Sequence, residues 1–500
     1  MFVKSARPTR EQLIELAKSN PEAIADLVLE LWDRVEKLEE KVRQLERNSR
    51  TSSKPPSSDK GNFTNRPKPK SLRGKSGRKP GGQKGHRGKT LEQTDCPDHV
   101  IDHRLEAGSR CPKCGAPLGD DASGCGPLEA KDCECRQVFE LPAIRIEVTE
   151  HRAEKRRCPQ CGEVVTAAFP EEVRAPVQYG PGVQAAALYL GGFQLIPYQR
   201  LSETFDELFD CPLSAGTLAN FVKRGGEKAA QAMEPVREAL AAAPVAHADE
   251  TGCTVFGKRH WLHVFSTAEL TCYHIDRQRG SPAMERMGLL PEFTGSLVHD
   301  SLSAYYKFKH CGHFLCNAHL LRELTYLHEE MDLAWAGEMI GLLLEAKALS
   351  DRQRALPEGA RAIIGQKTWL RIQTRYWEIV QEGLEANPEP PPPPKPKRGK
   401  VKRSKALNLL IRLRDRYEEI MGFFDYEHVP FDNNLAERDL RMMKTREKIS
   451  GTFRSDAHPA AFCNVRSVIS SLRKQASGIL EGLAQLIRSP RRLGQKLAGS

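Results

Sequence analysis

The sequence predicts a mixed α/β catalytic core, and three observations support this fold class. Apolar, aromatic-rich runs over residues 245–256, 260–266 and 270–275 are typical of three consecutive strands, with Gly252 as a bend and Gly257-Lys258 as a two-residue turn. A short helix is expected over residues 282–290, before a buried strand over residues 296–299. Alternating charged and apolar residues over 434–444 predict a later helix. This order of elements is that of a ribonuclease-H-like fold.

Three carboxylates occupy corresponding places in these elements. Asp249 is on the first predicted strand, Asp300 follows the fourth, and Glu437 is on the later helix. Magnesium prefers hard oxygen ligands, and two ions about 4 Å apart can hold both reacting oxygens of a phosphoryl transfer. We therefore predict that these residues bind two Mg²⁺ (or Mn²⁺) ions. Neighbours on a strand face opposite sides, so only one of Asp249 and Glu250 is expected at the metals, and we assign Asp249.

An ordinary structural role is the alternative for each carboxylate. An aspartate at a strand end is commonly a turn or cap residue, and a glutamate on a helix is commonly solvated. Residue type and order alone therefore leave the catalytic assignment open.

Several longer motifs carry a family resemblance over nearly the whole chain. They are His247-Ala-Asp-Glu-Thr-Gly, His260-Trp-Leu-His-Val, Val298-His-Asp-Ser, Cys316-Asn-Ala-His-Leu-Leu-Arg-Glu-Leu, Asn433-Asn-Leu-Ala-Glu-Arg-Asp-Leu-Arg and Lys448-Ile-Ser-Gly-Thr-Phe-Arg-Ser. They resemble the bacterial insertion-sequence transposases of the sixty-six group, in particular their TnpC-type large subunit of the DDE superfamily. The resemblance implies that Asp249, Asp300 and Glu437 are the catalytic triad.

Length and composition limit the class of protein. Five hundred residues suggest several domains. The sequence has neither an apolar run long enough to span a membrane nor a signal-peptide core, so we expect a soluble protein that is not exported. The family resemblance implies a cytoplasmic, nucleoid-associated bacterial protein. The fourteen cysteines favour metal sites and reduced thiols over disulfides. A net charge of +11 favours a polyanionic partner.

The first domain, residues 1–50, is predicted to be a coiled-coil helix. Its apolar residues alternate by four and three, which is the seam of a left-handed supercoil. The seam consists of Ile24, Val28, Leu31, Val35, Leu38, Val42 and Leu45. We expect a homodimer or a higher oligomer, and the alternative is an amphipathic helix packed on its own chain.

Residues 51–93 are predicted to be a disordered basic linker, rich in Ser, Pro, Gly and Lys. Twelve lysines or arginines and a single acid, Asp59, lie between Lys54 and Lys89. Such a segment contacts DNA phosphates independently of sequence, whereas the alternative is a solubilising spacer. The predicted DNA contacts here are Arg78, Lys79, Lys84 and Arg87.

Residues 94–165 are predicted to be a small zinc-binding domain. Two knuckles, Cys111-Pro-Lys-Cys114-Gly and Cys158-Pro-Gln-Cys161-Gly, supply four thiolates for a structural Zn²⁺ ion. Residues 138–148 between them resemble a strand. A redox pair is the weaker alternative, and the roles of Cys125, Cys133 and Cys135 stay open.

Residues 166–240 are predicted to be helical, over 183–190, 198–209, 214–223 and 226–243, with Ser214 as an N-cap. The second and third helices are joined by a short turn and could form a helix-turn-helix that binds a major groove. Helical hairpins also occur in many proteins that bind no DNA, so both interpretations stay open.

The catalytic core comprises residues 241–310 and 425–475, interrupted by a helical insertion over residues 311–424. Helices are expected over 320–349, 368–384 and 405–421, with a proline spacer and a basic run before the last. Cys316 and His319 resemble a Cys-x-x-His feature of several transposase groups, and a structural role is favoured over zinc binding. Residues 476–500 are expected to form a C-terminal helix.

Cationic residues follow Glu437. A basic helix beside a metal site can bind phosphates, since guanidinium groups match phosphate geometry, whereas the alternative is a solvated face. The predicted DNA contacts are Arg438, Arg441, Lys444, Arg446, Lys448 and Arg454.

Together these features predict metal-dependent cleavage of double-stranded DNA at element ends and strand transfer into target DNA. The resemblance also implies terminal inverted repeats as substrate and small accessory proteins of the same element as possible partners. Two alternatives stay open: a nuclease or resolvase of the same fold without strand transfer, and a non-mobile zinc-containing DNA-binding regulator.

Overall fold

The structure is a computed structural model that describes residues 10–46, 91–106, 108–118, 134–141, 144–356, 364–390, 403–455 and 457–499. It divides into two compact units. The larger unit comprises Met1–Lys70, Thr149–Glu207 and Cys211–Ser500, and the smaller comprises Ser71–Val148 with Leu208–Asp210. The linker residues 51–90, with Arg78, Lys79, Lys84 and Arg87, lie outside the described residues.

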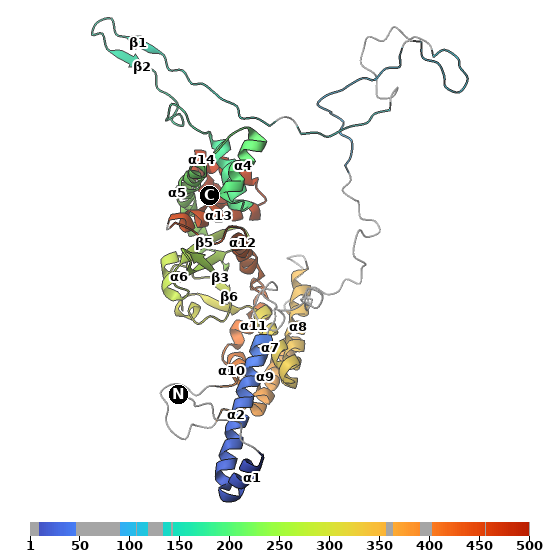
Figure 1. The fold of residues 1–500 in the computed structure, drawn as a ribbon, viewed down its shortest axis with the longest axis vertical. Coiled ribbons are helices and arrows are strands. Elements are labelled where there is room, and N and C mark those ends of the chain that lie inside the picture. The colour runs from blue at the N-terminus through green and yellow to red at the C-terminus, as the bar shows by residue number, and fades with distance from the viewer. Residues whose placement is uncertain are drawn as a thin grey trace. The chain divides into compact units, whose positions relative to one another are not determined.

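A five-stranded mixed sheet is the centre of the larger unit (Figure 1). Its strands are β3 (Val245–Val255), β4 (Lys258–Ser266), β5 (Thr271–Asp276), β6 (Ser296–His299) and β7 (Gly312–Leu315), in the order β5-β4-β3-β6-β7. The first three strands are antiparallel, whereas β6 and β7 run parallel to β3. A mixed α/β class is thus confirmed, and β7 is a strand that the sequence pattern did not predict.

The register corrects two details of the first hairpin. Val255 pairs with Lys258, so the turn consists of Phe256 and Gly257, one position earlier than expected. Both residues have left-handed backbone, with φ of 48° and 71°, as a two-residue type I′ turn requires. Gly252 does not bend the strand, because it pairs with Trp261 within an unbroken ladder.

Strand alternation divides the apolar residues of the sheet between its two faces. On one face, Ala246, Ala248 and Phe265 belong to a core shared with helices α5 (Ala215–Ala241), α14 (Ile479–Arg488) and α15 (Pro490–Ala498). On the other face, Cys253, Leu262 and Val264 pack with Ala436, Leu440 and Met443 of helix α12 (Asn434–Ser450). Helix α12, which contains Glu437, therefore packs on the same face of the sheet as the Asp249 side chain.

Helix α13 (Ala457–Lys474) covers the exposed edge of the sheet. The backbone N–H groups of Thr271 and Tyr273 on edge strand β5 donate to the hydroxyls of Ser471 (3.1 Å) and Ser467 (2.9 Å). Covering an edge strand in this way satisfies donors that would otherwise pair with another chain.

Helix α5 (Ala215–Ala241) is continuous for 27 residues, so the expected break near Gly225-Gly226 is wrong. The two glycines permit close packing instead. A Cβ at Gly226 would lie 2.5 Å from the Ala461 Cα atom of α13, and one at Gly225 would lie 2.8 Å from Leu188. The expected N-cap is confirmed, since Ser214 Oγ accepts from the N–H of Thr217 at 3.1 Å.

The segments before α5 are helical, as expected. Helix α3 (Pro181–Leu188) continues into a π-helical turn (Tyr189–Phe193), and helix α4 (Tyr198–Phe209) has the expected bounds. The chain ends in α14 (Ile479–Arg488) and α15 (Pro490–Ala498), with α6 (Ser281–Met287) between β5 and β6.

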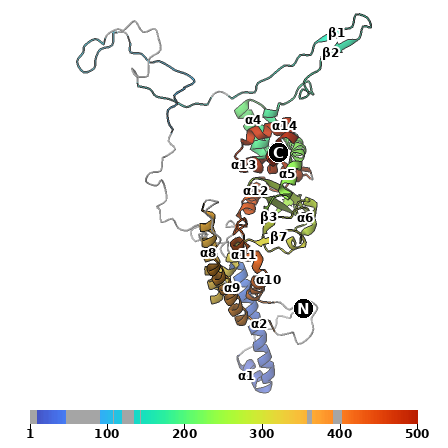
Figure 2. The same ribbon diagram turned by 180° about the vertical axis from the view of Figure 1, so that it is seen from behind.

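The insertion after β7 forms a helical body with its own apolar core (Figure 2). Its helices are α7 (Asn317–Met331), α8 (Ala334–Arg354), α9 (Gln366–Ala386), α10 (Lys405–Asp415) and α11 (Tyr417–Asp425). Two expected helices are therefore each split in two. The first splits at Asp332, whose φ of 51° is incompatible with a continuing helix, and the second splits at Arg416.

Two further helices lie at the amino terminus, α1 (Arg10–Ser19) and α2 (Pro21–Glu46). The apolar seam of α2 is half-exposed at Val28, Leu31, Val35 and Leu38. Among the described residues, none of the helices has the length and apolar character needed to cross a membrane.

The cysteine-rich segment contains one short hairpin, β1 (Lys155–Arg157) and β2 (Val164–Thr166), which encloses the second knuckle. The strand expected over residues 138–148 is wrong for its described residues, which have no regular structure. These residues have large exposed apolar side chains, including Val138 and Val148, and no partner strand is present in the described chain.

Candidate metal centre

Asp249 lies inside β3, and Asp300 directly follows the end of the neighbouring parallel strand β6. His247 of β3 pairs with Val298 of β6, and each aspartate follows two residues later. One oxygen from each of Asp249, Glu250 and Asp300 lies within 4.8 Å of the other two. Strand pairing thus brings together carboxylates that are 51 positions apart in the sequence.

Glu250 is the functional-site residue that strand alternation missed. We expected only one of the two neighbouring acids near the metals, but the Glu250 carboxylate also belongs to this oxygen cluster. It is fully buried and accepts hydrogen bonds from Arg279 Nε (2.9 Å) and Tyr305 Oη (2.7 Å). Arg279 also lies 3.9 Å from Asp300. Neither Arg279 nor Tyr305 lies in a sequence motif or a periodic pattern that would have predicted its contact with Glu250.

The cluster concentrates negative charge at a partly buried position. Burial raises the pKa of Asp249 well above its usual value, and the neighbouring charges of Glu250, Asp300 and Glu437 raise it further. The backbone N–H of Glu250, which donates to Asp249 at 2.8 Å, acts in the opposite direction. Burial and the charge of Asp300 likewise raise the pKa of Glu250. Perturbed buried carboxylates of this kind are characteristic of functional sites, and a cation would relieve their repulsion.

Glu437 lies in a second group of metal-ligating side chains. Its carboxylate, the Cys316 thiol and the His319 imidazole each offer one atom within 4.8 Å of the other two. Glu437 Oε1 is 3.6 Å from His319 Nδ1, and Glu437 Oε2 is 3.9 Å from Arg322. Within the described parts of the chain, neither Glu437 Oε1 nor His319 Nδ1 has a hydrogen-bond partner, although both atoms are buried.

The two groups are electrostatically linked. Glu437 contributes to the raised pKa of Asp249, and Asp300 acts on the pKa of His319. For His319, burial is the largest influence and lowers the pKa, which favours the neutral imidazole. Burial also raises the pKa of the Cys316 thiol to about 12.

Asn433 connects these groups across the insertion. Its side chain donates to the Ala248 carbonyl (2.8 Å) and lies 2.9 Å from His247 Nδ1, while its backbone N–H donates to Cys316 Sγ (3.2 Å). Asn317 next to that cysteine donates to the Phe431 carbonyl at 3.1 Å. The start of α12 is therefore fixed both to the strand of Asp249 and to the start of α7, although the insertion separates them in sequence.

The basic residues after Glu437 have different surroundings. Arg438, Arg441, Lys448 and Arg454 are exposed. Lys444 donates to the Gly252 carbonyl at 2.8 Å. The guanidinium carbon of Arg446 lies 3.3 Å from the Phe453 ring centre, and burial lowers the pKa of Arg446 to about 10. Its contact with DNA remains a prediction.

The two cysteine knuckles have the same local geometry. In the first knuckle, the Cys111 N–H donates to the Ala116 carbonyl and the Gly115 N–H donates to the Cys111 carbonyl. In the second, the Cys158 N–H donates to the Glu163 carbonyl and the Gly162 N–H donates to the Cys158 carbonyl. Both glycines have φ of +74°, which explains why glycine follows each pair. Backbone N–H groups lower the pKa of Cys111 and of Cys158, which favours thiolates. Cys111 and Cys114 belong to the smaller unit, and Cys158 and Cys161 to the larger.

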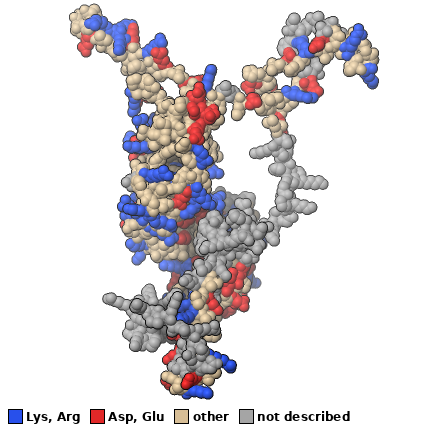
Figure 3. Space-filling view, in the orientation of Figure 1, with Lys and Arg blue, Asp and Glu red and all other residues tan. Residues whose placement is uncertain are grey.

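Charge on the surface bears on the helix-turn-helix prediction, which remains a prediction. Lys and Arg side chains are spread over the face that includes the sheet, whereas acidic side chains gather over α4 (Figure 3). Glu203, Asp206 and Glu207 of α4 are exposed. In a helix-turn-helix, the first helix crosses the DNA backbone, and an acidic face there is unfavourable.

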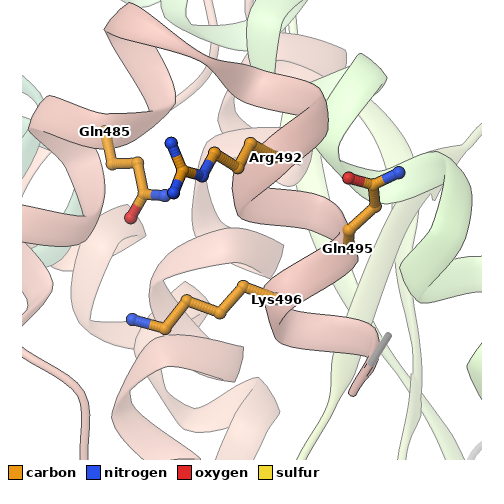
Figure 4. A pocket seen from close by; sticks show the side chains of 4 residues that line it. All are labelled: Gln485, Arg492, Gln495 and Lys496. Carbon is orange, nitrogen blue, oxygen red and sulfur yellow. The ribbon is translucent and has the colours of Figure 1, made fainter.

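A hollow at the carboxyl terminus contains none of the carboxylates described above. It is lined by Gln485 of α14 and by Arg492, Gln495 and Lys496 of α15 (Figure 4). Its lining is basic and polar, so it offers no ligand set for a divalent cation.

Comparison with known families gives two matches. The model of the Transposase IS66 family matches residues 176–460, which include the sheet, the insertion and both groups of candidate ligands. The model of a family of unknown function matches residues 7–92. No curated protein sequence matches the chain.

Proposed function

Because the chain belongs to the IS66 transposase family, we propose that it is a DDE-type DNA transposase with Asp249, Asp300 and Glu437 as its catalytic carboxylates. In this proposal, it cleaves the ends of its element and joins the freed 3′ ends to target DNA. The observation that carries the proposal is the convergence of Asp249 and Asp300 oxygens within 4.8 Å, from the interior of β3 and from the end of the parallel strand β6.

The strand order supports a ribonuclease-H-like core. Three antiparallel strands followed by two parallel strands give the order β5-β4-β3-β6-β7, with carboxylates on the first and fourth strands in sequence. The third carboxylate is on a helix that packs on the Asp249 face of the sheet. This arrangement agrees with the order of elements expected from sequence.

The donor set fits divalent cations. Asp249 and Asp300 provide hard oxygen ligands, as Mg²⁺ or Mn²⁺ prefers, and Glu437 provides another on the same side of the sheet. When bound, two such ions supply charge stabilisation to a phosphoryl transfer. The chain itself partly buries Asp249, and it orients α12 through Asn433. Glu250 is committed to Arg279 and Tyr305, so we assign it a positioning role.

The test uses the full chain and a plasmid that contains the DNA flanking the gene. Asp249→Asn, Asp300→Asn and Glu437→Gln should each abolish Mg²⁺-dependent strand cleavage while DNA binding persists. Glu292→Gln, at an exposed carboxylate, is the matched control and should cleave normally. Retained cleavage in any of the three variants contradicts its assignment. Supplying pre-cleaved ends with a target plasmid separates a transposase from a nuclease, since only the transposase joins them.

We also propose that the exposed seam of α2 mediates self-association. Half-exposed apolar residues at heptad spacing favour a coiled-coil dimer or higher oligomer. Leu31→Lys should lower the mass measured by light scattering toward that of the monomer, whereas the neighbouring Glu30→Lys should not. An unchanged mass for Leu31→Lys would exclude this seam as the interface.

A further inference from the structure

We propose that Arg259, Trp261 and Arg279 form a binding site for the phosphodiester backbone of the DNA strand that approaches the carboxylate cluster. We call these three residues the arginine–tryptophan platform. The proposal rests on the proposed function and adds a specific contact that the motifs did not indicate.

Trp261 is the centre of the platform. The guanidinium carbon of Arg259 lies 4.7 Å from its ring centre, and that of Arg279 lies 4.8 Å away. Guanidinium groups are attracted to the face of an indole ring, and stacking restricts the motion of a long side chain. Trp261, which is half-exposed, therefore holds both guanidinium groups in defined positions. Arg279 is paired with Glu250, so Arg259 is the cation available to a phosphate.

Arg279 connects the platform to the carboxylate cluster. Its guanidinium binds Glu250 at 2.8 Å and lies 3.9 Å from Asp300. Arg259 lies on β4, two residues before Trp261 and nearer the turn of the β3–β4 hairpin. Strand alternation places Arg259 and Trp261 on the sheet face of Glu250, opposite Asp249. A DNA strand that lies at the carboxylate cluster and continues over this face would meet the platform with a flanking phosphate.

Gly252 explains how Arg259 reaches its position. Gly252 pairs directly with Trp261 across the hairpin, and a Cβ at this position would lie 2.1 Å from the Arg259 guanidinium. The missing side chain leaves the space that Arg259 occupies. The Gly252 carbonyl also accepts from Lys444 of α12 at 2.8 Å, and α12 packs on the face of the sheet opposite the platform.

The charge of Arg259 favours a phosphate ligand. Arg259 is exposed, and across the described ranges it forms no ion pair with a carboxylate. Arg286, by contrast, is neutralised by two hydrogen bonds to Asp276. An exposed, preorganised guanidinium with free N–H groups matches the geometry of a phosphate oxygen pair.

The experiment measures binding of the full chain to a 40-base-pair duplex as a function of salt concentration. Because each phosphate contact contributes about one unit to the slope of log K against log salt, Arg259→Ala should lower that slope by about 1. Arg352→Ala, at an exposed arginine of α8, is the matched control for loss of one charge. Gly252→Ala, which places a Cβ where the Arg259 guanidinium lies, should lower the slope as well by displacing Arg259.

If Arg259→Ala has the same slope of log K against log salt as the wild type, the platform does not bind DNA phosphate and the proposal is wrong. That result leaves the proposed function intact if the wild-type chain still cleaves DNA with Mg²⁺. The converse result, a lowered slope without any wild-type cleavage, supports the DNA contact and removes the catalytic proposal. The two failures are therefore distinguishable in the same preparations.

Discussion

His319 Nδ1 lies 3.6 Å from Glu437 Oε1, and both atoms are buried without a hydrogen bond in the described parts of the chain. Buried polar atoms without partners are costly, so an arrangement that leaves two of them facing one another calls for an explanation. The neutral imidazole, favoured by burial, can donate to Glu437 after a small movement or share an ion with it. In either case, His319 restricts the position of the carboxylate.

We predict that His319→Ala weakens the response to Mg²⁺ without abolishing cleavage. Residues that orient a metal ligand typically contribute about 10–100-fold in metal affinity. The Mg²⁺ concentration for half-maximal cleavage should rise by about that factor, and excess Mg²⁺ should restore the rate. His328→Ala, at an exposed histidine of the same helix, is the control. A His319→Ala variant that remains inactive at saturating Mg²⁺ would place His319 among the groups that contact the reacting atoms.

Asp249→Asn should stabilise the metal-free protein at neutral pH. The raised pKa of Asp249 means that the folded state binds a proton more tightly than the unfolded state. Stability from this group is therefore complete below its usual pKa of 3.8 and is lost as the pH rises toward the raised value. The uncharged amide removes this loss. In EDTA the thermal midpoint of the variant should exceed that of the wild type at pH 7, by about 2–4 °C for each kcal/mol relieved.

The pH dependence provides the check on that prediction. The difference between variant and wild type should vanish below about pH 4, where both side chains are neutral. Added Mg²⁺ should raise the midpoint of the wild type and not that of the variant, because only the wild type retains the ligand. A variant less stable than the wild type at pH 7 in EDTA would show that Asp249 is not under electrostatic strain.

Two glycines of α5 should respond in opposite directions to alanine. Gly226→Ala places a Cβ 2.5 Å from the Ala461 Cα atom, so α5 and α13 must separate. Overpacking of this kind costs about 1–3 kcal/mol. Gly216→Ala has no neighbour closer than 3.7 Å and should gain up to about 1 kcal/mol from helix propensity. Urea denaturation of the two variants measures both effects, and equal stabilities would show that the glycine pair does not define the packing of α5.

The fold of the sheet was accessible from sequence because its signals are local. Alternation and short apolar runs place β6 (Ser296–His299) at its predicted bounds, and the charge pattern places Glu437 on a helix. Strand β7 was missed because four residues, Gly312–Leu315, contain too little alternation to stand out. The Gly225-Gly226 pair predicts a helix break locally, yet packing against α13 makes it part of a continuous helix.

The contacts around the carboxylates depend on tertiary structure, so the sequence predicts them less well than it predicts the strands. Alternation fixes the direction in which each Cβ leaves β3, but it does not fix where the longer Glu250 side chain places its carboxylate. Arg279 and Tyr305 determine that position, and they come from a loop and from a short 3-10 helix without a recognisable spacing. Asn433 belonged to a visible motif, yet its three contacts to β3 and Cys316 required the folded chain.

The cysteine knuckles predict bound zinc, and removal of either pair tests it. The thiols of Cys111 and Cys158 have lowered pKa values because backbone N–H groups point toward them, which favours the thiolate that zinc requires. Elemental analysis of the purified chain should give about one zinc per chain. Cys111→Ser with Cys114→Ser should remove this zinc, and Cys158→Ser with Cys161→Ser should do the same if all four thiolates share one ion. Substituting the buried Cys211 and Cys311 instead controls for the loss of two thiols. A knuckle variant that folds and keeps its full metal content would exclude that pair as ligands.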